Sequence, residues 1–533
     1  MPAPAAALAF IDTSLRDGHQ SLLATRMSGR QCNAVLPRLM DVGYGVMELW
    51  GGAVLDASLR FTHEDPFERL ITLRRLLDQA ERPIQIRSLC RGQNLFGYTP
   101  YPDNVVCEFM KEAVRLGSGP SSLEAGGSDA PAASGAMRNK PIGPTSHRIR
   151  VFDALNDARN LTTAVMATKT FNGEVEAAIS YTTSPVHDVP YFIRFAGQCM
   201  DLGADRLAIK DMAGLLAPDV AFELIEGLQH AYPGVPITLH SHCTTGLASA
   251  TYVVGMLCGV ESLDTGHGPM AGGTAQPPVE LMQWFADALG LETNVDPAAF
   301  PAADAALRAA RAELAEHDRG GDGSSGPWPA EPTAEHRRVI DEAIRLLKTR
   351  EPGACDQAAT LIETRLMEPM GYPPADRSQL ESQIPGGMIS NLQSQLSDMG
   401  KLDSLPAVLE EVPRVRKAAG YVPLVTPTSQ IVGSQAAFNV ILGTPYKQVS
   451  VPFRDLVTGR YGKLPGPVDT AVLAKVSGDQ EPYSGRAADL AGEIDLPAVY
   501  ASNGKLIRSR RDLLLLLLFP MPAKQYLSQR AEG

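Results

Sequence analysis

The chain has 533 residues, which is enough for one large domain and one or two smaller ones. A hydrophobic content of 44% and a charged content of 20% are ordinary for a globular protein, and the net charge of −12 argues against a general binder of nucleic acid or membrane surfaces. The seven cysteines include no Cys-x-x-Cys pair, so they argue against a disulfide framework or a zinc ribbon and fit a reducing cytoplasm.

Neither apolar end of the sequence predicts a membrane or export signal. The N-terminal stretch MPAPAAALAF has no basic segment and runs directly into a motif, so we expect no signal peptide. The apolar run at 513–519 is only seven residues long, whereas a membrane span needs roughly 20. We therefore expect this run to form a helix that packs on another domain, in a cytoplasmic protein without a membrane span.

Short apolar segments alternate with amphipathic helical segments over the first ~290 residues. The pattern predicts strands at 7–12, 45–50, 83–89, 149–152 with the residues just before, 175–182, 206–210, 235–240 and 260–265. Eight strands, each followed by a helix, indicate an α/β fold of the (β/α)8 TIM-barrel type. A doubly wound open sheet is the alternative, but no Gly-rich dinucleotide fingerprint follows the first strand.

Composition divides the chain into three parts. We expect a TIM-barrel domain at 1–300, interrupted at 117–146 by a flexible insertion rich in Gly, Ser, Ala and Pro. A linker and a helical insertion follow at 301–376, with a second Gly- and Pro-rich seam at 318–332. We expect 377–533 to form a mostly helical C-terminal domain that completes the entrance of an active site.

The strand at 235–240 ends in His240-Ser241-His242. Residues i and i+2 of a strand project to the same face, so both imidazoles would point at one spot beyond the sheet. Neutral imidazole is the commonest metal ligand in proteins, although two polar residues at a strand end can also serve only to hydrogen-bond loops.

Other predicted strands end in further polar residues, and a TIM barrel gathers functional groups at these ends. The first strand leads into DTSLRDGHQ, the third ends near Arg91, and the sixth ends in Lys210-Asp211. Two histidines together with one carboxylate from these strand ends are a plausible divalent-metal set with open positions for substrate. The Lys210 ammonium would repel a metal. One alternative is that Lys210 forms a salt bridge with Asp211 or Asp17. The other is that the neutral Lys210 amine has taken up carbon dioxide, which gives a carbamate that could coordinate the ion.

Several motifs in one order resemble the biotin-dependent carboxyltransferases that act on 2-oxo acids. They are IDTSLRDGHQSLLATRM, ELWGGAVLDASLRFTHEDPFERL, RGQNLFGYTPYPDNVV, VFDALND, YTTSPVH, IKDMAGLL and PGGMISNLQSQL. The family includes the carboxyltransferase domain of pyruvate carboxylase, the α subunit of oxaloacetate decarboxylase and the 5S subunit of methylmalonyl-CoA transcarboxylase. The likeness covers most of the chain.

The resemblance implies a role for each of a small set of residues. A divalent metal ion (Zn, Co or Mn) is held by Asp17, His240, His242 and a carbamylated Lys210. Gln20 and Arg91 bind the 2-oxo acid, and Arg16 with Gln20 steadies the enolate oxygen. Asp56 and Tyr98 lie at the biotin end. Ser390, where pyruvate carboxylases carry Thr, shuttles a proton between biotin and substrate.

The function that the resemblance implies is that of one component of a larger complex. It moves a carboxyl group between oxaloacetate or pyruvate and biotin through a metal-stabilised enolpyruvate. The chain has no Ala-Met-Lys-Met biotinylation motif and no recognisable ATP-grasp half, so biotin is expected on a separate biotin carboxyl carrier protein within that complex. We expect a homodimer that binds no nucleic acid.

Two other functions fit part of the sequence. Arg16-Asp17-Gly18-His19-Gln20 and the His pair also suit a metal-dependent aldol or Claisen enzyme of the hydroxymethylglutaryl-CoA lyase or isopropylmalate synthase type. That group does not need Lys210-Asp-Met-Ala-Gly or PGGMISNL. A scaffold protein with an idle site is the non-enzyme alternative.

Overall fold

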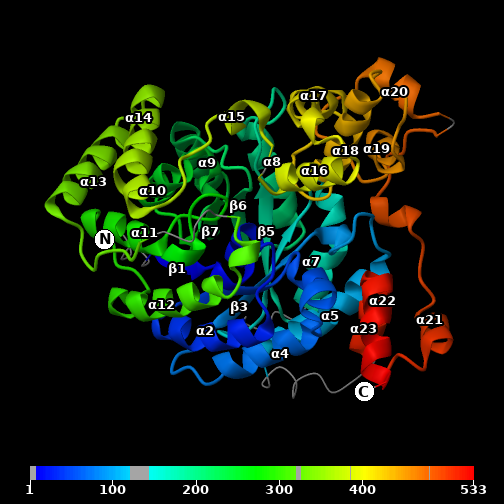
Figure 1. The fold of residues 1–533 in the computed structure, drawn as a ribbon, viewed down its shortest axis with the longest axis horizontal. Coiled ribbons are helices and arrows are strands. Elements are labelled where there is room, and N and C mark those ends of the chain that lie inside the picture. Colours follow the sequence, from blue (N-terminus) through cyan, green and yellow to red (C-terminus); the bar gives the residue numbers. More distant parts are fainter. Residues whose placement is uncertain (1–7, 120–142, 320–325, 385, 479, 533) are drawn as a thin grey trace.

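Eight parallel strands close into a barrel at the centre of the computed structural model (Figure 1), which describes residues 8–119, 143–319, 326–384, 386–478 and 480–532. The strands are β1 (Ala9–Asp12), β2 (Val46–Gly51), β3 (Gln85–Cys90), β4 (Arg148–Phe152), β5 (Glu174–Ser180), β6 (Arg206–Asp211), β7 (Ile237–Ser241) and β8 (Ser262–Thr265). Each strand pairs with its neighbour in sequence, and β8 pairs with β1. The predicted TIM barrel is confirmed, and every predicted strand end lies within about two residues of the observed one.

One long helix follows each strand and packs on the outside of the barrel. These helices are α2 (Gly29–Asp41), α4 (Pro66–Leu77), α5 (Asp103–Ser118), α7 (Thr162–Thr170), α8 (Val189–Asp201), α9 (Pro218–Ala231), α10 (Ala248–Cys258) and α11 (Val279–Ala288). Helix α4 shows how the local sequence produces such a helix. The Asp65 carboxylate caps its first turn by accepting from the Phe67 amide, and Pro66 occupies the first helical position. Leu70, Leu73 and Leu77 then lie on one buried face.

Ion pairs fill part of the barrel interior, where apolar side chains usually predominate. The side chains that form these ion pairs are fully buried and lie on strands of the barrel. They are Glu48, Arg87, Arg150, Glu176 and Asp264. The Arg87 guanidinium donates to Glu48 at 2.8 Å and to Asp264 at 2.8 Å. Arg150 pairs with Glu176 and with Asp264. Each buried charge therefore has an opposite charge in contact, which is the condition for keeping ions out of water.

Three helices follow the barrel strands and cover its side. Helix α12 (Phe300–Ala312) packs on α2, and the pair α13 (Ala334–Leu347) and α14 (Pro352–Ile362) packs on α10. Figure 1 shows α13 and α14 beside α10 and α11. The helices predicted in this part of the chain are confirmed.

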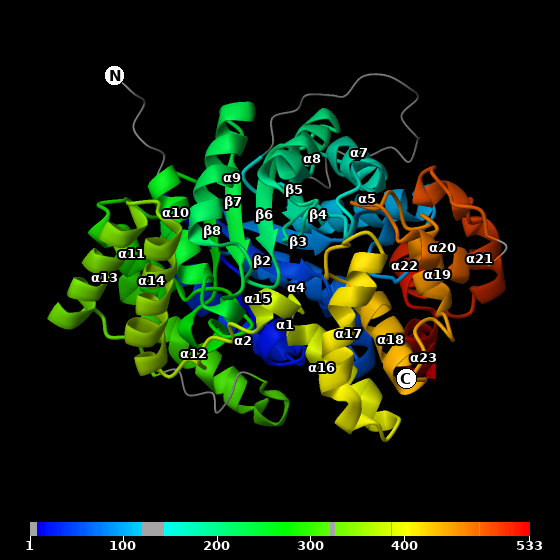
Figure 2. The ribbon, with the colours of Figure 1, turned by 90° about the horizontal axis from the view of Figure 1, so that it is seen from above.

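The C-terminal region is helical and has a hydrophobic core of its own. Its helices are α15 (Gln379–Ser382), α16 (Gly386–Asp398), α17 (Leu405–Ala418), α18 (Thr428–Ile441), α19 (Val451–Val457), α20 (Thr470–Val476), α21 (Leu496–Asn503), α22 (Arg510–Leu518) and α23 (Pro520–Glu532). Buried side chains of α16, α17, α18 and α19 form this second core. Figure 2 shows α16, α17 and α18 grouped apart from α13 and α14.

This region lies against the carboxyl ends of the barrel strands. Val425 packs in one apolar cluster with Leu89 of β3 and Phe152 of β4. The Arg416 guanidinium donates to the Thr182 hydroxyl at 3.0 Å, just after β5. The Lys463 amide donates to Asp157, after β4, at 2.7 Å. The C-terminal helices therefore cover the end of the barrel at which the predicted site residues lie.

The leucine-rich run forms α22 and packs on the barrel, as predicted. Leu514, Leu515 and Leu518 belong to the same core as the barrel and its helices. The Tyr101 hydroxyl donates to the Leu518 carbonyl at 2.9 Å, which ties α22 to the segment before α5. Among the helices that the structure describes, none combines the length and the apolar character that crossing a bilayer requires.

The predicted insertion at 117–146 falls mainly outside the described residues. Its first two residues complete α5, which ends at Ser118. The seam at 318–332 is described except for 320–325.

Candidate active site

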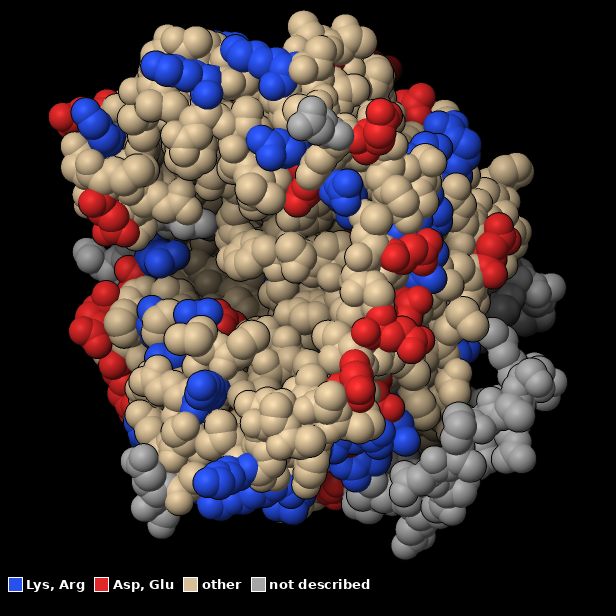
Figure 3. Space-filling view, turned by 90° about the vertical axis from the view of Figure 1, so that its right-hand side faces the viewer, with Lys and Arg blue, Asp and Glu red and all other residues tan. Residues whose placement is uncertain are grey.

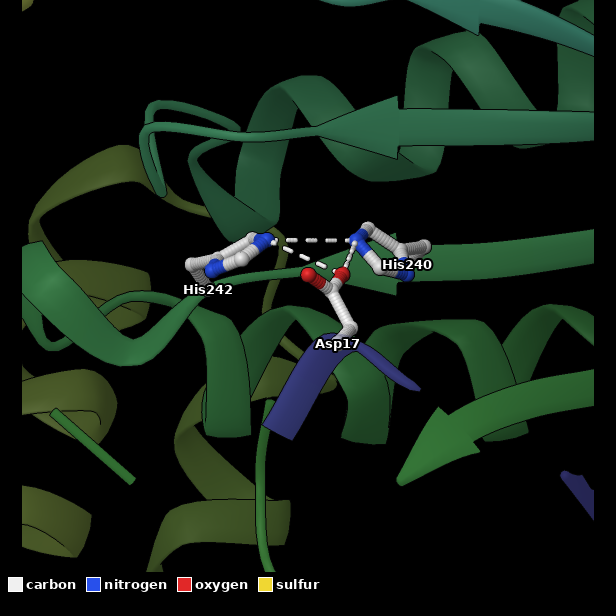
Figure 4. Close-up of side chains that lie close together, drawn as sticks. All are labelled: Asp17, His240 and His242. Atoms are coloured by element: carbon white, nitrogen blue, oxygen red, sulfur yellow. Dashed lines mark hydrogen bonds and ion pairs between the residues drawn. The ribbon is translucent and has the colours of Figure 1, made fainter. Parts of the chain in front are cut away.

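Asp17, His240 and His242 meet at the carboxyl end of the barrel (Figure 4). His240 Nε2 lies 3.2 Å from Asp17 Oδ2 and 3.2 Å from His242 Nε2, and His242 Nε2 lies 3.6 Å from Asp17 Oδ2. All three side chains are buried. The two imidazoles and the carboxylate that the sequence placed in one set thus present three donor atoms to one point.

Hydrogen bonds at the far side of each imidazole set its orientation. His240 Nδ1 contacts the Asp264 carboxylate at 2.8 Å, and His242 Nδ1 contacts the Thr274 carbonyl oxygen at 2.5 Å. Such partners place the proton on Nδ1 and leave the Nε2 lone pair for a ligand. Burial lowers the pKa of His240 to about 4, which keeps this ring neutral. The donor set therefore fits a divalent metal ion.

Asp17 owes its position to an irregular turn after β1. Residues Ser14–Gly18 form one turn of π-helix, in which the Gly18 amide donates to the Thr13 carbonyl. Such single turns recur at functional sites. Gly18 also lies against the next loop, because a Cβ at this position would stand 2.9 Å from the Met270 carbonyl oxygen. Burial alone would raise the pKa of Asp17, but Arg16 and Lys210 bring it well below its usual range.

Lys210 completes the cluster from the neighbouring strand. The register pairs Lys210 of β6 with His240 of β7. Lys210 Nζ lies 2.9 Å from His240 Nε2 and 3.8 Å from Asp17 Oδ2. Asp211 turns away and accepts from the Leu215 and Leu216 amides. Burial lowers the pKa of Lys210 to about 7, so a large share of this amine is neutral near neutral pH.

Two residues that support this centre were missed by the sequence analysis. Gln276 Nε2 lies 3.1 Å from Asp17 Oδ2 and 3.1 Å from His242 Nε2, and Asp264 holds His240. The sequence did contain an indication for Asp264, because a carboxylate inside the apolar strand VESLDT needs a buried partner. Gln276 lies in a loop after β8, and no sequence pattern indicated its role.

Arg16 and Gln20 form a second part of the site. Arg16 Nη1 lies 3.1 Å from Asp17 and 3.5 Å from Gln20 Oε1, and its other edge pairs with Glu48. Gln20 Oε1 also accepts from the Ala53 amide at 3.1 Å. With Oε1 so engaged, the Nε2 hydrogens are what Gln20 can offer to a substrate oxygen. Gly52 permits this approach, because a Cβ there would stand 2.9 Å from Gln20 Oε1.

Arg91 lies at the end of β3, in a loop that holds it. Its guanidinium donates to the Gly97 carbonyl at 3.0 Å and to the Phe96 carbonyl at 2.5 Å. Burial lowers the pKa of Arg91, and Tyr98 and Asp56 act in the opposite direction. Tyr98 is 56% exposed, and Asp56 pairs with Arg60 at 2.6 Å.

Ser390 lies in α16, which belongs to the second core. The position of its side chain falls outside what the structure describes.

One side of the molecule carries a hollow (Figure 3). The atoms inside this hollow belong mostly to uncharged residues, and Lys, Arg, Asp and Glu side chains are interspersed around it. Neither positively nor negatively charged side chains predominate on this face of the molecule.

Two protein families match the chain. The family described as "Conserved carboxylase domain" matches residues 380–533, and the family described as "HMGL-like" matches residues 144–306. The first match covers the helical C-terminal region, and the second covers barrel strands β4 to β8.

Two similar proteins cover nearly the whole chain. A pyruvate carboxylase subunit of Methanocaldococcus jannaschii is 36% identical over 522 residues, which are 97% of this chain and 77% of that protein. The methylmalonyl-CoA carboxyltransferase 5S subunit of Propionibacterium freudenreichii subsp. shermanii is 34% identical over 529 residues, which are 97% of this chain and 87% of that protein.

A solved structure agrees in fold over the same length. The carboxyl transferase domain of Rhizobium etli pyruvate carboxylase with pyruvate and biocytin has a TM-score of 0.72 and 26% identity, and it covers 99% of this chain and 78% of that chain. These relatives favour a carboxyltransferase over the aldol or Claisen alternative, and over an idle scaffold. The chain belongs to the biotin-dependent carboxyltransferases and is an enzyme of that family.

Proposed function

We propose that the chain transfers a carboxyl group between a 2-oxo acid, pyruvate or oxaloacetate, and biotin carried on a separate protein. The observation that carries the proposal is the buried convergence of Asp17, His240, His242 and Lys210 at the covered end of the barrel. The relatives named as subunits of pyruvate carboxylase and of methylmalonyl-CoA carboxyltransferase support a role within a complex that includes a biotin carboxyl carrier protein.

Asp17, His240, His242 and a carbamylated Lys210 would hold a divalent ion, Zn, Co or Mn. Such an ion supplies Lewis-acid polarisation of the 2-oxo carbonyl. The carbamate forms when the neutral Lys210 amine attacks carbon dioxide and loses a proton to a base. A carbamylated Lys210 would add a carboxylate in place of an ammonium that otherwise repels the ion. The lowered pKa of Lys210 supports this step, because only the neutral amine has a lone pair for the attack.

Arg91, Arg16 and Gln20 would bind the substrate. The planar fork of Arg91 suits the carboxylate of the 2-oxo acid. Arg16 is fixed between Glu48 and Asp17, so its charge is already in place for the negative oxygen that develops when a methyl proton leaves. Gln20 adds its Nε2 hydrogens at the same oxygen.

Asp56, Tyr98 and Ser390 would serve the biotin end of the site. Asp56 follows β2 and Tyr98 follows β3, as Arg91 does, and Ser390 lies on α16 in the region that covers the barrel end. The Ser390 hydroxyl can accept a proton from one partner while it donates its own to the other, which moves one proton between substrate carbon and biotin nitrogen. Serine keeps the hydroxyl of threonine and loses the methyl group that restricts its rotamers.

The domain roles follow from this assignment. The barrel at 1–300 would bind metal and substrate, 301–376 would link and cover, and 377–533 would complete the entrance for carrier-bound biotin. A homodimer and a cytoplasmic location remain predictions, the second supported by cysteines that are all free.

The decisive experiment combines native mass spectrometry near neutral pH with metal analysis of the same sample. We expect one divalent ion per chain and a carbon-dioxide adduct on the Lys210 peptide that is lost on acidification. The Lys210→Arg protein, with its charge retained, should lack the adduct and bind metal more weakly. If the chain binds metal while Lys210 is unmodified, under conditions that preserve carbamates, the proposed carbamate is wrong. Failure to move labelled carboxyl from oxaloacetate to a biotinylated carrier protein would overturn the function.

A further inference from the structure

A cavity of about 870 Å³ opens outside the barrel, between α11, α12, residues 327–332 and the first turns of α13. None of its lining residues belongs to the Asp17, His240 and His242 centre. Its size falls within the range of small-molecule sites. Because it lies apart from the reaction just described, its occupant must be argued from its own walls.

Aromatic rings form the walls of this cavity. Trp284 and Trp328 meet edge to face with centroids 5.0 Å apart, and Phe300 lies on the α12 side. Trp328 is held in place, because its indole NH donates to the Tyr372 hydroxyl at 3.0 Å. Fixed aromatic faces bury apolar groups and also attract cations.

One carboxyl group in the cavity wall has an oxygen atom without a hydrogen-bond partner among the described residues. Glu280 lines the cavity and is only 3% exposed. Its Oε1 accepts from the Gly268 amide at 3.0 Å, but its Oε2 is buried and has no hydrogen-bond partner among the described residues. His267 lies 3.6 Å from Glu280 and 3.1 Å from Asp304. Burial and the neighbouring Asp304 raise the pKa of Glu280 to about 7, so this carboxyl group exchanges between its neutral and charged forms near neutral pH. A buried carboxyl oxygen without a hydrogen-bond partner is costly, and a bound cation would favour the charged form.

The same cavity holds an unmatched cation. Arg308 lines it from α12, and its Nη2 is buried without a hydrogen-bond partner in the part of the chain that the structure describes. Arg337, the other cation of the lining, pairs with Glu331 at 3.4 Å. The cavity lining thus combines an aromatic surface with a carboxyl group and a guanidinium group, and each of these two groups has one buried atom without a hydrogen-bond partner among the described residues.

We propose that this cavity binds an α-amino acid with an apolar side chain. The ammonium group would donate to Glu280, the carboxylate would accept from Arg308, and the side chain would pack on Trp284, Trp328 and Phe300. A simple amine would leave Arg308 unmatched, and a simple acid would leave Glu280 unmatched. A divalent metal is disfavoured, because His267 already contacts Asp304 through Nδ1 and the Tyr44 hydroxyl through Nε2 at 3.0 Å.

Three related probes test the proposal by calorimetry on the full, metal-loaded chain. They are L-phenylalanine, phenethylamine, which lacks the carboxylate, and 3-phenylpropionate, which lacks the ammonium. We expect L-phenylalanine to bind at one site per chain with Kd below about 1 mM. Each of the other two should bind about 10- to 100-fold more weakly, because each loses one charged hydrogen bond. Saturating pyruvate should leave the binding of L-phenylalanine unchanged.

Variants locate the site. Arg308→Gln should weaken L-phenylalanine about 10- to 100-fold and leave phenethylamine unchanged. Glu280→Gln should weaken both. Arg337→Gln is the matched control, since it removes a cation of the same lining that already has a partner, and its Kd should equal that of the parent. If Glu280→Gln fails to fold, the probe series and Arg308→Gln still decide the matter.

Three results would overturn the proposal. The first is no binding of L-phenylalanine, L-leucine or L-tryptophan up to about 1 mM. The second is phenethylamine binding as tightly as L-phenylalanine with no effect of Arg308→Gln, which would indicate a site for cations alone. The third is loss of binding when pyruvate is added, which would place the ligand in the carboxyltransferase site.

Discussion

Among the residues that the structure describes, two buried clusters combine histidine with carboxylates, and they use histidine in opposite ways. In the first, burial and Lys210 lower the pKa of His240 to about 4. In the second, burial alone would lower the pKa of His267, but its contacts with Asp304 and Glu280 raise it to about 10. The first ring is neutral and offers a lone pair, whereas the second is a cation that holds two carboxylates. The balance of neighbouring charges, more than burial, decides whether a histidine becomes a ligand or an ion-pair partner.

The largest effect should come from removing a ligand of the first cluster. His242→Ala should abolish stoichiometric metal binding and lower kcat by about 1,000-fold, because Lewis-acid catalysis is lost. Metal analysis and a carboxyl-transfer assay measure both. His267→Gln serves as the comparison and should retain its metal. If it loses metal to the same degree, the two clusters do not differ as proposed.

Disruption of the second cluster should lower the stability of the folded protein. His267→Gln leaves Glu280 and Asp304 buried without their cation, so the free energy of unfolding should fall by about 3 kcal/mol. Urea denaturation monitored by circular dichroism measures it. His230→Gln, at an exposed position, is the control and should change it by less than about 0.5 kcal/mol. Equal stability of the His267→Gln protein and its parent would argue against an ion pair.

The orientation of His240 should show a smaller effect on metal affinity. Asp264→Asn removes the charge behind His240 Nδ1 and should weaken metal binding about 10- to 100-fold, as loss of such a partner does. Glu176→Gln is the matched control, because Glu176 pairs with Arg150 in the same array but does not contact His240. Competition with a metal indicator gives the affinities. Equal losses in both variants would assign the effect to the array as a whole.

The pH dependence should be the most gradual effect. The folded-state pKa of His267 lies above its ordinary value of 6.5, so its stabilising contribution is fully present below pH 6.5 and is lost as the pH rises through about 10. The stability difference between the parent and His267→Gln should therefore shrink between pH 7 and 10, by at most about 1.4 kcal/mol per pH unit. A difference that is constant over this range contradicts the raised pKa.

The fold was predictable because each strand and helix carried a local pattern. The alternation of apolar strands with helices such as α4, together with the lack of a dinucleotide fingerprint, was enough to select the barrel. The convergence of His240 and His242 with a carboxylate was predictable because strand ends meet in that fold, whereas the choice of Asp17 as that carboxylate came from the family resemblance.

Contacts between distant segments were not predictable in this way. Nothing local in TAQPP indicates that the Gln276 amide reaches Asp17, and nothing near Tyr44 indicates that its hydroxyl meets His267. The interior ion pairs were visible only as charges inside apolar strands, and their partners depend on the register of five strands. Such pairings are set by the closed barrel, which no single segment encodes.

The contact between Gly18 and the Met270 carbonyl has an evolutionary consequence. The loop that contains Met270 also supplies the Thr274 carbonyl that orients His242 and the Gln276 amide at Asp17. An alanine at position 18 would have to displace this loop, and with it two supports of the metal donors. Substitutions at position 18 and within 270–276 should therefore be epistatic: either one alone is harmful, and the lineage can pass from glycine to alanine only after the loop has changed.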